Sequence, residues 1–432
     1  MLIKLKKIIL KIDQFLFKKF GSYKSVKPLE SIKEVRKIFS YLNDDSTENN
    51  VRFVGGCVRK AISGEEIDDI DLATLLEPQE VKKRLEKKEI KVFDSGISHG
   101  TVTAIINKKK IEITTLRKDI STDGRRANVQ FTLDWKEDSS RRDFTINSIY
   151  SDLEGRIFDP QNGVYDLQNG LVKFIGLPDE RIQEDYLRIL RYLRFFSCYS
   201  KIDHDQEIIS SIKRNINGLN KISNERIFNE LSKILKLENN YKIFSNNSSK
   251  EIILNIFPQF KCYERLKVIN GLDAKIKDKY DNELILALLI IDETKDYEYF
   301  CHKYKVSNNM KNRFKNIALN YENIKSKKFF SKEKIKKLIY LLGKKNVSDL
   351  LLFSICVNKK LKVTDVEKLL QYIKICEIPK FPISGDYLKK HGFDEGKILG
   401  KQLELLKQKW LNNNFVIDKK IIEKSLGKNY KN

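Results

Sequence analysis

The spacing of apolar and polar positions changes at about residue 177. Before it, four short apolar runs predict strands, the last two forming a hairpin around an Asn-Lys-Lys turn: Val51–Val54, Ile70–Thr74, Thr101–Ile106 and 110–116. Helical spacing is found between strands, near 78–88 and 139–151. The pattern predicts a domain in which helices accompany a β-sheet.

After Pro178 the apolar residues recur every three or four positions almost to the end of the chain, which predicts amphipathic helices. Breaks near 237–240, 245–250 and 378–384 divide this part into about three helical pieces. We therefore expect an α+β protein, with a mixed β-sheet in an N-terminal head and only helices after it.

The composition narrows the class of partner. The formal charge of +24, from 83 Lys and Arg against 59 Asp and Glu, favours a polyanion such as nucleic acid, although Lys is frequent throughout the chain. The six cysteines are scattered without zinc-ligand spacing, which predicts reduced thiols in a cytoplasmic protein. The longest apolar run, 284–291, is too short to cross a bilayer, so no membrane partner is expected; the segment 1–20 could form an amphipathic helix on a membrane surface or on the protein itself.

Two glycines followed by two aspartates carry the most specific chemical signal. Gly55 and Gly56 follow the first predicted strand, and Asp69 and Asp71 flank the start of the second. Glycine lets backbone approach a phosphate, and carboxylates two residues apart on a strand point the same way and can share hard cations. The pattern predicts a site for nucleotide and magnesium, although an acidic turn before a strand would look similar. Asp68 is out of phase and is expected to face away.

Two further segments add charged groups. Glu112, between β-branched residues of a predicted strand, is either a third acid near the metal or a residue on an exposed strand face. Arg141, Arg142 and Asp143 are predicted at a helix start, where arginine can grip phosphate through two donors and the carboxylate can hold a ribose hydroxyl or order the arginines.

The segment 184–196 predicts one amphipathic helix with polar side chains at steps of three: Asp185, Arg188, Arg191 and Arg194. Residues three apart form one oblique ridge on a helix. This ridge could present an acceptor and several donors to the edge of a base. The alternative is an ordinary surface of ion pairs; the nearly pure arginine ridge favours ligand binding.

Together these segments resemble the class II tRNA nucleotidyltransferases, the CCA-adding enzymes, and the related bacterial poly(A) polymerases. The resemblance extends from about residue 30 to the end and is strongest over 51–235. The matching motifs are Gly55-Gly56-x-Val58-Arg59 with Asp69-x-Asp71, Arg141-Arg142-Asp143-Phe144-Thr145, Asp159-Pro160-Gln161-Asn162-Gly163, Glu184-Asp185-x-x-Arg188, and Asn224-Glu225-Arg226 through Glu230-Leu231. Lys60 departs from the family, which usually has an aspartate there that supports the motif.

The resemblance implies an N-terminal helical extension (1–30), a nucleotidyltransferase head (31–176), a neck that selects the nucleotide (177–240), a body (241–378) and a tail that binds tRNA (379–432). Asp69 and Asp71 would hold two Mg²⁺ ions, with Glu112 as a possible third ligand. Asp185 and Arg188 would present a Watson–Crick-like edge to CTP and then to ATP. The nucleotide-binding residues would be Gly55, Gly56, Arg59, Arg141, Arg142, Asp143, Asp185, Arg188, Arg191 and Arg194.

Within the family, the sequence favours full CCA addition. His99-Gly100-Thr101-Val102 before the hairpin resembles CCA-adding enzymes, and the polar segment 118–130 resembles a flexible loop that CC-only enzymes lack. Gly124-Arg125-Arg126 lacks the apolar lead-in of the similar poly(A) polymerase motif. The implied partners are the tRNA acceptor end, CTP and ATP, with no protein partner. A poly(A) polymerase, a CC- or A-adding enzyme and a non-catalytic RNA-binding protein are the alternatives.

Overall fold

The structure is a computed structural model that describes residues 29, 32–43, 50–122, 127–358, 361–417 and 422. The predicted N-terminal extension, apart from Leu29, and Gly124-Arg125-Arg126 lie outside the described residues. The chain divides into two compact units, one made of Met1–Leu237 with Lys242–Ile256 and the other of Glu238–Tyr241 with Phe257–Asn432. The finer division into head, neck, body and tail stays a prediction.

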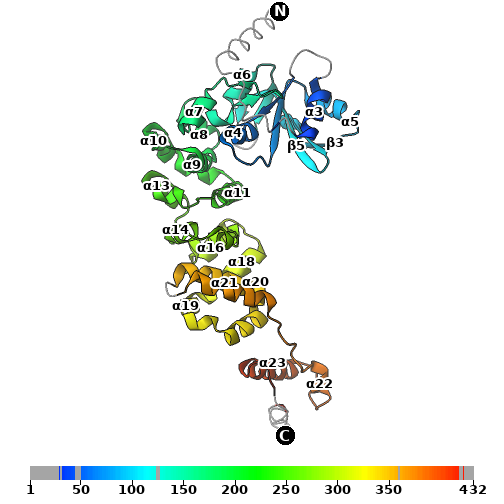
Figure 1. Cartoon of the computed structure of the whole chain (residues 1–432), viewed down its shortest axis with the longest axis vertical. Helices are drawn as coiled ribbons and strands as arrows, with labels where there is room; N and C mark the ends of the chain where they lie inside the picture. Colours follow the sequence, from blue (N-terminus) through cyan, green and yellow to red (C-terminus); the bar gives the residue numbers. More distant parts are fainter. Residues whose placement is uncertain are drawn as a thin grey trace, which may run out of the picture. The chain divides into compact units, whose positions relative to one another are not determined.

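A seven-stranded mixed sheet forms the head, drawn in blue and cyan in Figure 1. Its strands are β1 (Val51–Val54), β2 (Ile70–Thr74), β3 (Lys91–Gly96), β4 (Thr101–Ile106), β5 (Lys109–Thr115), β8 (Tyr150–Ser151) and β9 (Ile157–Phe158). The spatial order is β3-β4-β5-β2-β1-β8-β9; β2 and β5 are parallel, and the other neighbouring pairs are antiparallel. The predicted mixed sheet and α+β class are confirmed.

The predicted strands and hairpin follow from local chemistry. Asn107 and Lys108 both have positive φ, 49° and 66°, the turn geometry that suits the right-handed twist of a tight hairpin between β4 and β5. In β5, Ile111 and Ile113 are buried whereas Glu112 is exposed. This alternation means that one face of the sheet is covered and that Glu112 lies on the other.

The two faces of the sheet have different neighbours. Phe53 of β1 packs against Phe39 of α3 (Lys33–Asn43), with ring centroids 4.8 Å apart. The adjacent Arg52 points the opposite way and lies 4.4 Å from the ring centroid of Trp135 in α6 (Trp135–Ser140). Ala73 of β2 shares a buried cluster with Trp135, so Asp71, two residues earlier on the same strand, lies on the α6 face.

The predicted helix at 139–151 is wrong. The helix α6 ends at Ser140, and the chain continues through a short 3-10 turn, η3 (Thr145–Asn147), into β8. Every residue from Phe144 to Tyr150 is buried. Thr145, Asn147 and Ser148 are buried together with the apolar residues, so the spacing of polar and apolar positions does not report which face is exposed, and the helical spacing was misleading.

The segment 118–130, predicted as a flexible loop, has regular secondary structure in its described residues. Its described residues pair as a two-stranded antiparallel ladder, β6 (Arg117–Thr122) and β7 (Ala127–Phe131). Polar sequence alone does not distinguish such a ladder from a loop, because neither strand contributes an apolar row to the large sheet.

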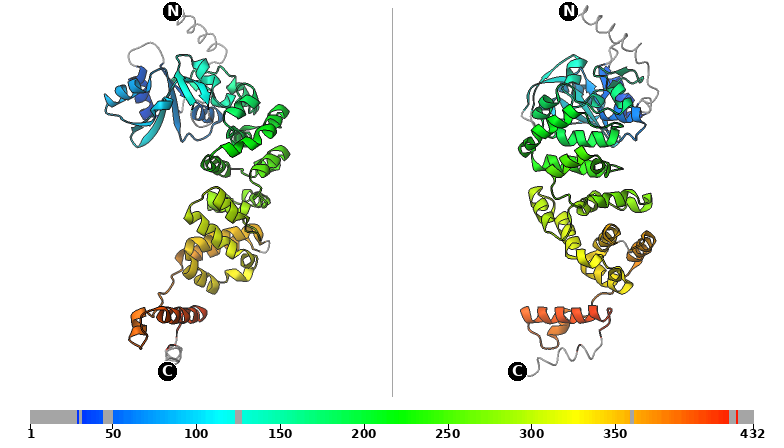
Figure 2. Two further views of the ribbon diagram at one scale, coloured as in Figure 1. Left: turned by 180° about the vertical axis from the view of Figure 1, so that it is seen from behind. Right: turned by 90° about the vertical axis from the view of Figure 1, so that its left-hand side faces the viewer.

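The remainder is helical, as predicted. The first unit also holds α4 (Gly56–Ser63), α5 (Pro78–Glu86), α7 (Gly163–Asn169), α8 (Pro178–Glu184), α9 (Arg188–Tyr199), α10 (Gln206–Asn215), η4 (Ile216–Lys221), α11 (Asn224–Leu235), α12 (Lys242–Ser245) and α13 (Asn247–Ile256). Figure 2 shows its later helices, in green, stacked in layers beside the sheet.

The second unit consists of helices: α14 (Glu264–Asn270), α15 (Ala274–Lys277), α16 (Asn282–Ile290), α17 (Asp296–Lys303), α18 (Asn308–Leu319), α19 (Tyr321–Ile324), η5 (Lys327–Phe330), α20 (Lys332–Val357), α21 (Val363–Ile375), α22 (Gly385–Lys389) and α23 (Lys397–Asn412). Gly343, with a φ of 82°, interrupts α20. Among the described helices, none has both the length and the apolar character that a membrane crossing requires.

Candidate active site

The two glycines form the turn between β1 and α4. Gly55 has a φ of +70°, and a Cβ added there would lie 3.4 Å from the carbonyl oxygen of Asn147 and 3.7 Å from Nη1 of Arg142. A left-handed residue in so close a setting favours glycine. The turn therefore brings bare backbone and the first turn of a helix next to an arginine, an arrangement that suits a phosphate.

Arg59 lies one turn into α4 and is only 6% exposed. Its Nη1 donates a hydrogen bond to Oδ1 of Asn147, and its guanidinium lies 4.8 Å and 4.9 Å from the ring centroids of Phe195 and Tyr199 on α9. Its Nε has no partner among the described residues, and no described carboxylate forms an ion pair with it. A buried cation that is oriented but not neutralised is suited to bind an anion.

The two aspartates lie at the start of β2. Asp69 is exposed, and Asp71 is half-buried directly across the parallel ladder from Glu112 of β5. Burial and the nearby Glu112 and Asp69 charges raise the pKa of Asp71 to about 6, against the opposing charges of Arg142 and Arg59. Oxygen ligands whose charge is poorly compensated fit a hard divalent cation.

Glu112 is next to Asp71, but its part in metal binding stays a prediction. In the part of the chain that the structure describes, no three His, Cys, Asp or Glu side chains converge to hold one ion. Asp69 and Asp71 stay the candidate ligands predicted from the sequence motif. Asp68 forms an ion pair with Lys60, so the lysine that departs from the family pattern has a partner of its own.

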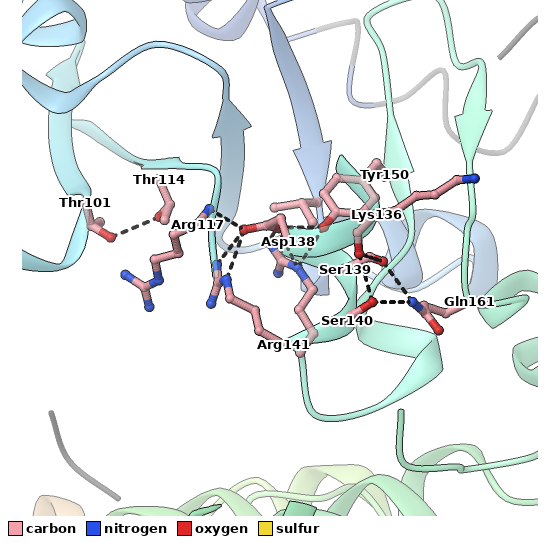
Figure 3. Close-up of polar contacts among 12 residues, drawn as sticks. Thr101, Thr114, Arg117, Lys136, Asp138, Ser139, Ser140, Arg141, Tyr150 and Gln161 are labelled. Carbon is pink, nitrogen blue, oxygen red and sulfur yellow. Dashed lines mark hydrogen bonds and ion pairs between the residues drawn. The ribbon is translucent and has the colours of Figure 1, made fainter. Parts of the chain in front are cut away.

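Asp138 of α6 holds both arginines of the Arg141-Arg142 pair. Figure 3 shows Asp138 together with Arg141 and Tyr150. Its Oδ1 accepts from Nε and Nη2 of Arg141 at 3.0 Å and 2.8 Å, and its Oδ2 accepts from Nε and Nη2 of Arg142 at 3.3 Å and 3.0 Å. The hydroxyl of Tyr150 donates to Oδ2 at 2.6 Å, and the backbone N–H of Arg117, at the start of β6, donates to Oδ1 at 3.3 Å.

This cluster fixes the direction of the guanidiniums. Burial would raise the pKa of Asp138, which is 1% exposed, but Arg142, Arg141 and Tyr150 outweigh it and hold the pKa well below its usual range. Because Nε and Nη2 of each arginine face Asp138, the Nη1 atoms remain for a ligand, and no described residue accepts a hydrogen bond from them. The prediction that the arginines begin a helix is wrong: they follow the end of α6.

Asp143 connects the head to α9. Its Oδ2 accepts from Nε and Nη2 of Arg191 at 2.8 Å and 2.5 Å, and its Oδ1 accepts from Nδ2 of Asn147 at 2.9 Å. Burial alone would raise the pKa of Asp143, yet Arg191 and the hydrogen bond from Asn147 lower it to about 2. Since the side chain of Asn147 also accepts a hydrogen bond from Arg59, a continuous polar chain joins Arg59 to α9.

Asp185 and Arg188 lie where α8 ends and α9 begins, so the predicted single helix over 184–196 is wrong. Asp185 is extended, with φ −153° and ψ 101°, and its Oδ1 accepts from the backbone N–H of Leu187 at 3.2 Å. Its Oδ2 accepts from Nη2 of Arg226 on α11 at 2.7 Å. Arg188 donates to Glu184 at 2.7 Å. Both predicted base-reading groups are thus held in place by charged neighbours.

Arg191 and Arg194 have internal partners as well. Nε of Arg194 donates to Oε1 of Glu230, a buried acid of α11, at 2.5 Å. The four residues of the predicted ridge therefore form ion pairs with residues outside the ridge, Glu184, Asp143, Glu230 and Arg226. Binding of nucleotide by these residues stays a prediction.

Three further residues of the site were missed from the sequence: Asp138, Asn147 and Arg181. Asp138 and Asn147 lie within five residues of the Arg141-Arg142-Asp143 run, and Arg181 lies four residues before Asp185. Polar residues this close to a motif were a usable signal, but only the fold shows which motif residues each of them binds.

Comparisons with known proteins agree with this geometry. The family model described as the poly A polymerase head domain matches residues 51–173, and one described as a probable RNA and SrmB-binding site of polymerase A matches residues 201–263. The mitochondrial CCA tRNA nucleotidyltransferase 1 of Mus musculus is 33% identical over 399 residues, which cover 90% of this chain and 88% of the relative. A CCA-adding enzyme of Lactococcus lactis is 35% identical over 279 residues, or 62% of this chain and 67% of the relative.

Solved structures show the same fold. The CCA-adding enzyme of Bacillus stearothermophilus in complex with CTP aligns with a TM-score of 0.72 at 22% identity, covering 92% of this chain and 96% of that one. The CCA-adding enzyme of Thermotoga maritima complexed with tRNA aligns with a TM-score of 0.63 at 20% identity, covering 94% and 98%.

Proposed function

The chain belongs to the family of CCA tRNA nucleotidyltransferases, and we propose that it adds C, C and A to the 3′ end of tRNA from CTP and ATP. The observation that carries the proposal is the assembly, in one unit, of a glycine turn, two aspartates and the Asp185/Arg188 pair. The relative with 33% identity spans nearly the whole of this chain, so the likeness is not confined to the head.

Nucleotidyltransferases of this kind use a divalent metal, and we propose two magnesium ions held by Asp69 and Asp71. The raised pKa of Asp71 supports this, because a bound cation relieves the charge that burial and Glu112 make unfavourable. When bound, the metal would lower the pKa of the attacking hydroxyl and compensate the negative charge of the triphosphate.

The chain's own residues bind and orient the triphosphate. The tRNA 3′-hydroxyl oxygen attacks the α-phosphorus, the bond from that phosphorus to the β-phosphate oxygen breaks, pyrophosphate leaves with the bonding electrons, and the hydroxyl proton passes to water. The backbone at Gly55 and Gly56 lets the phosphates approach. Arg59 and Arg142 stabilise the charge that develops on the phosphates, since both are oriented before the ligand binds.

Asp185 and Arg188 select the base. A carboxylate accepts hydrogen bonds and a guanidinium donates them, so together they can match the Watson–Crick edge of cytosine or adenine. Arg226 and Glu184 orient the two side chains. The helical second unit and the net charge of +24 are consistent with a surface that holds the acceptor end of tRNA.

The decisive experiment incubates the protein with tRNA that lacks its last three nucleotides, magnesium, CTP and ATP. We expect a product extended by C, C and A, and no extension by Asp71→Ala. Extension by C and C alone would make the protein a CC-adding enzyme, and long oligo(A) products from ATP alone would make it a poly(A) polymerase. RNA binding without extension would support a non-catalytic RNA-binding protein.

The compartment is a separate proposal. The scattered cysteines, all free in the structure, fit the reducing cytoplasm. The vertebrate relatives are named as mitochondrial proteins. Recovery of the protein in purified mitochondria rather than in the cytoplasmic fraction would overturn the cytoplasmic assignment.

A further inference from the structure

Arg181 of α8 joins two parts of the site that are distant in sequence. Its Nη2 donates to the backbone carbonyl oxygens of Arg141 and Arg142, at 2.7 Å each. Its Nη1 donates to Oε1 of Glu184 at 2.7 Å. Only 11% of its side chain is exposed, so one buried guanidinium touches both the backbone of the phosphate-side arginines and the acid at the end of α8.

The same acid holds the base-reading arginine. Nη1 of Arg188 donates to Oε2 of Glu184 at 2.7 Å and to the backbone carbonyl oxygen of Arg181 at 2.8 Å. Arg181 thus contacts Arg188 both through the shared carboxylate and through its own backbone. A guanidinium can span several acceptors because its donors form a rigid planar fork, whereas an ammonium is a compact point of charge.

This arrangement is electrostatically costly. Two arginines share one carboxylate, and burial together with the neighbouring Arg188 charge lowers the pKa of Arg181, although Glu184 opposes this. Nε of Arg181 is buried without a partner among the described residues. A fold selected for stability alone would gain little from such a cluster, so a role in the function of the site is the better explanation.

We propose that Arg181 is a positioning residue for nucleotide selection. It fixes Glu184, and hence the guanidinium of Arg188, relative to the backbone of Arg141 and Arg142. This inference rests on the proposed function, in which Arg188 reads the base and the Arg141-Arg142 region binds the ribose or phosphates. A nucleotide held at its phosphate end then meets the base-reading group in one register, and a base with the wrong edge leaves polar groups unpaired.

The test compares Arg181→Lys and Arg181→Gln with matched variants of Arg214. Arg214 of α10 forms an ion pair with Asp179 of α8, the helix that also carries Arg181, but the side chain of Arg214 is 58% exposed. The kcat/KM of single C addition is measured with CTP and with UTP on tRNA lacking the last three nucleotides. Single A addition is measured with ATP and with GTP on tRNA ending in CC.

We expect the Arg181 variants to lose about tenfold or more in both ratios, CTP over UTP and ATP over GTP, the loss that corresponds to one misplaced hydrogen bond. The Arg214 variants should keep the wild-type ratios. Each ratio compares two nucleotides on one preparation, so a misfolded fraction cancels and a loss of stability alone cannot produce the effect.

Two results would overturn the proposal. In the first, Arg181→Lys does not change the two ratios. If the rates with all four nucleotides fall by one common factor, Arg181 is a structural residue; if the rates do not change, it is dispensable. In the second, the Arg214 variants lose discrimination equally, which would assign the effect to the helix as a whole. A wild-type protein that does not extend tRNA would instead overturn the proposed function.

Discussion

Replacement of Asp71 by asparagine is expected to abolish nucleotide addition and, in the absence of metal, to stabilise the protein. The pKa of Asp71 rises from 3.8 to about 6, with burial as the largest cause and repulsion from Glu112 next. An acid whose pKa is raised by folding binds protons more tightly in the native state, so ionisation weakens the fold. This cost is fully present above about pH 6 and absent below the unfolded-state pKa of 3.8.

The size of the effect follows from the shift. A difference of about two pKa units, at 1.36 kcal/mol each, corresponds to about 3 kcal/mol at pH 8. Asp71 keeps partial contact with water, which screens the repulsion, so a gain of about 1–3 kcal/mol in the free energy of unfolding is expected for Asp71→Asn. The gain should shrink as the pH falls from 6 to 4, because the wild-type carboxyl becomes protonated.

Denaturant unfolding at pH 8 and at pH 4, with and without Mg²⁺, tests this reasoning. Asp69→Asn is the matched control: its side chain is exposed, so a change within about 0.5 kcal/mol is expected. Mg²⁺ should stabilise the wild type and not Asp71→Asn, since a ligand stabilises the state that binds it. If metal-free Asp71→Asn is less stable than the wild type at pH 8, the conclusion that burial and repulsion dominate this carboxylate is wrong.

Three further substitutions separate the parts of the site. Asp138→Asn should raise the KM for CTP about tenfold and lower the free energy of unfolding, measured with denaturant, by about 3 kcal/mol, because a buried carboxylate bound to two arginines is lost. The control is Asp152→Asn, at a buried acid outside the site, which should leave the KM for CTP unchanged. Asn147→Ala should lower kcat/KM for CTP and for ATP by one common factor of about ten in steady-state assays, and unequal factors would refute its role on the phosphate side. Arg226→Ala should reduce discrimination between CTP and UTP by releasing Asp185, and unchanged discrimination in single-addition assays would refute that role.

The sequence predicted the elements whose pattern is local. The strands Val51–Val54 and Ile70–Thr74 have the predicted bounds. For Glu112 the sequence left two positions open, and the structure places it on an exposed face of β5, opposite Asp71. The segment 144–150 was misread, because its polar residues Thr145, Asn147 and Ser148 are buried together with its apolar ones, so the polar and apolar positions do not mark an outer and an inner face. Periodicity therefore predicts amphipathic elements well and enclosed ones poorly.

The candidate site was predictable as motifs but not as a network. The spacing of Asp185 and Arg188 suggested one helical ridge, whereas the extended backbone at Asp185 turns its carboxylate toward Arg226 of another helix. Contacts such as that between Arg191 and Asp143 join residues 48 positions apart. No local pattern encodes which of several charged residues will pair across such distances.

The contacts of α9 explain why a displacement of that helix should have a different kinetic effect from a substitution of Asn147 or Arg226. Its first turn carries Arg188, which reads the base in the proposed mechanism, while Phe195 and Tyr199 further along contact the guanidinium of Arg59. A shift of the whole helix would therefore alter binding of the phosphates and reading of the base together. Asn147 contacts Arg59 on the proposed phosphate side, and Arg226 contacts Asp185 on the proposed base side. Asn147→Ala is expected to lower kcat/KM for CTP and ATP equally, and Arg226→Ala to reduce discrimination between CTP and UTP. If each variant shows only its own defect, phosphate binding and base reading are coupled through α9 rather than through a general property of the fold.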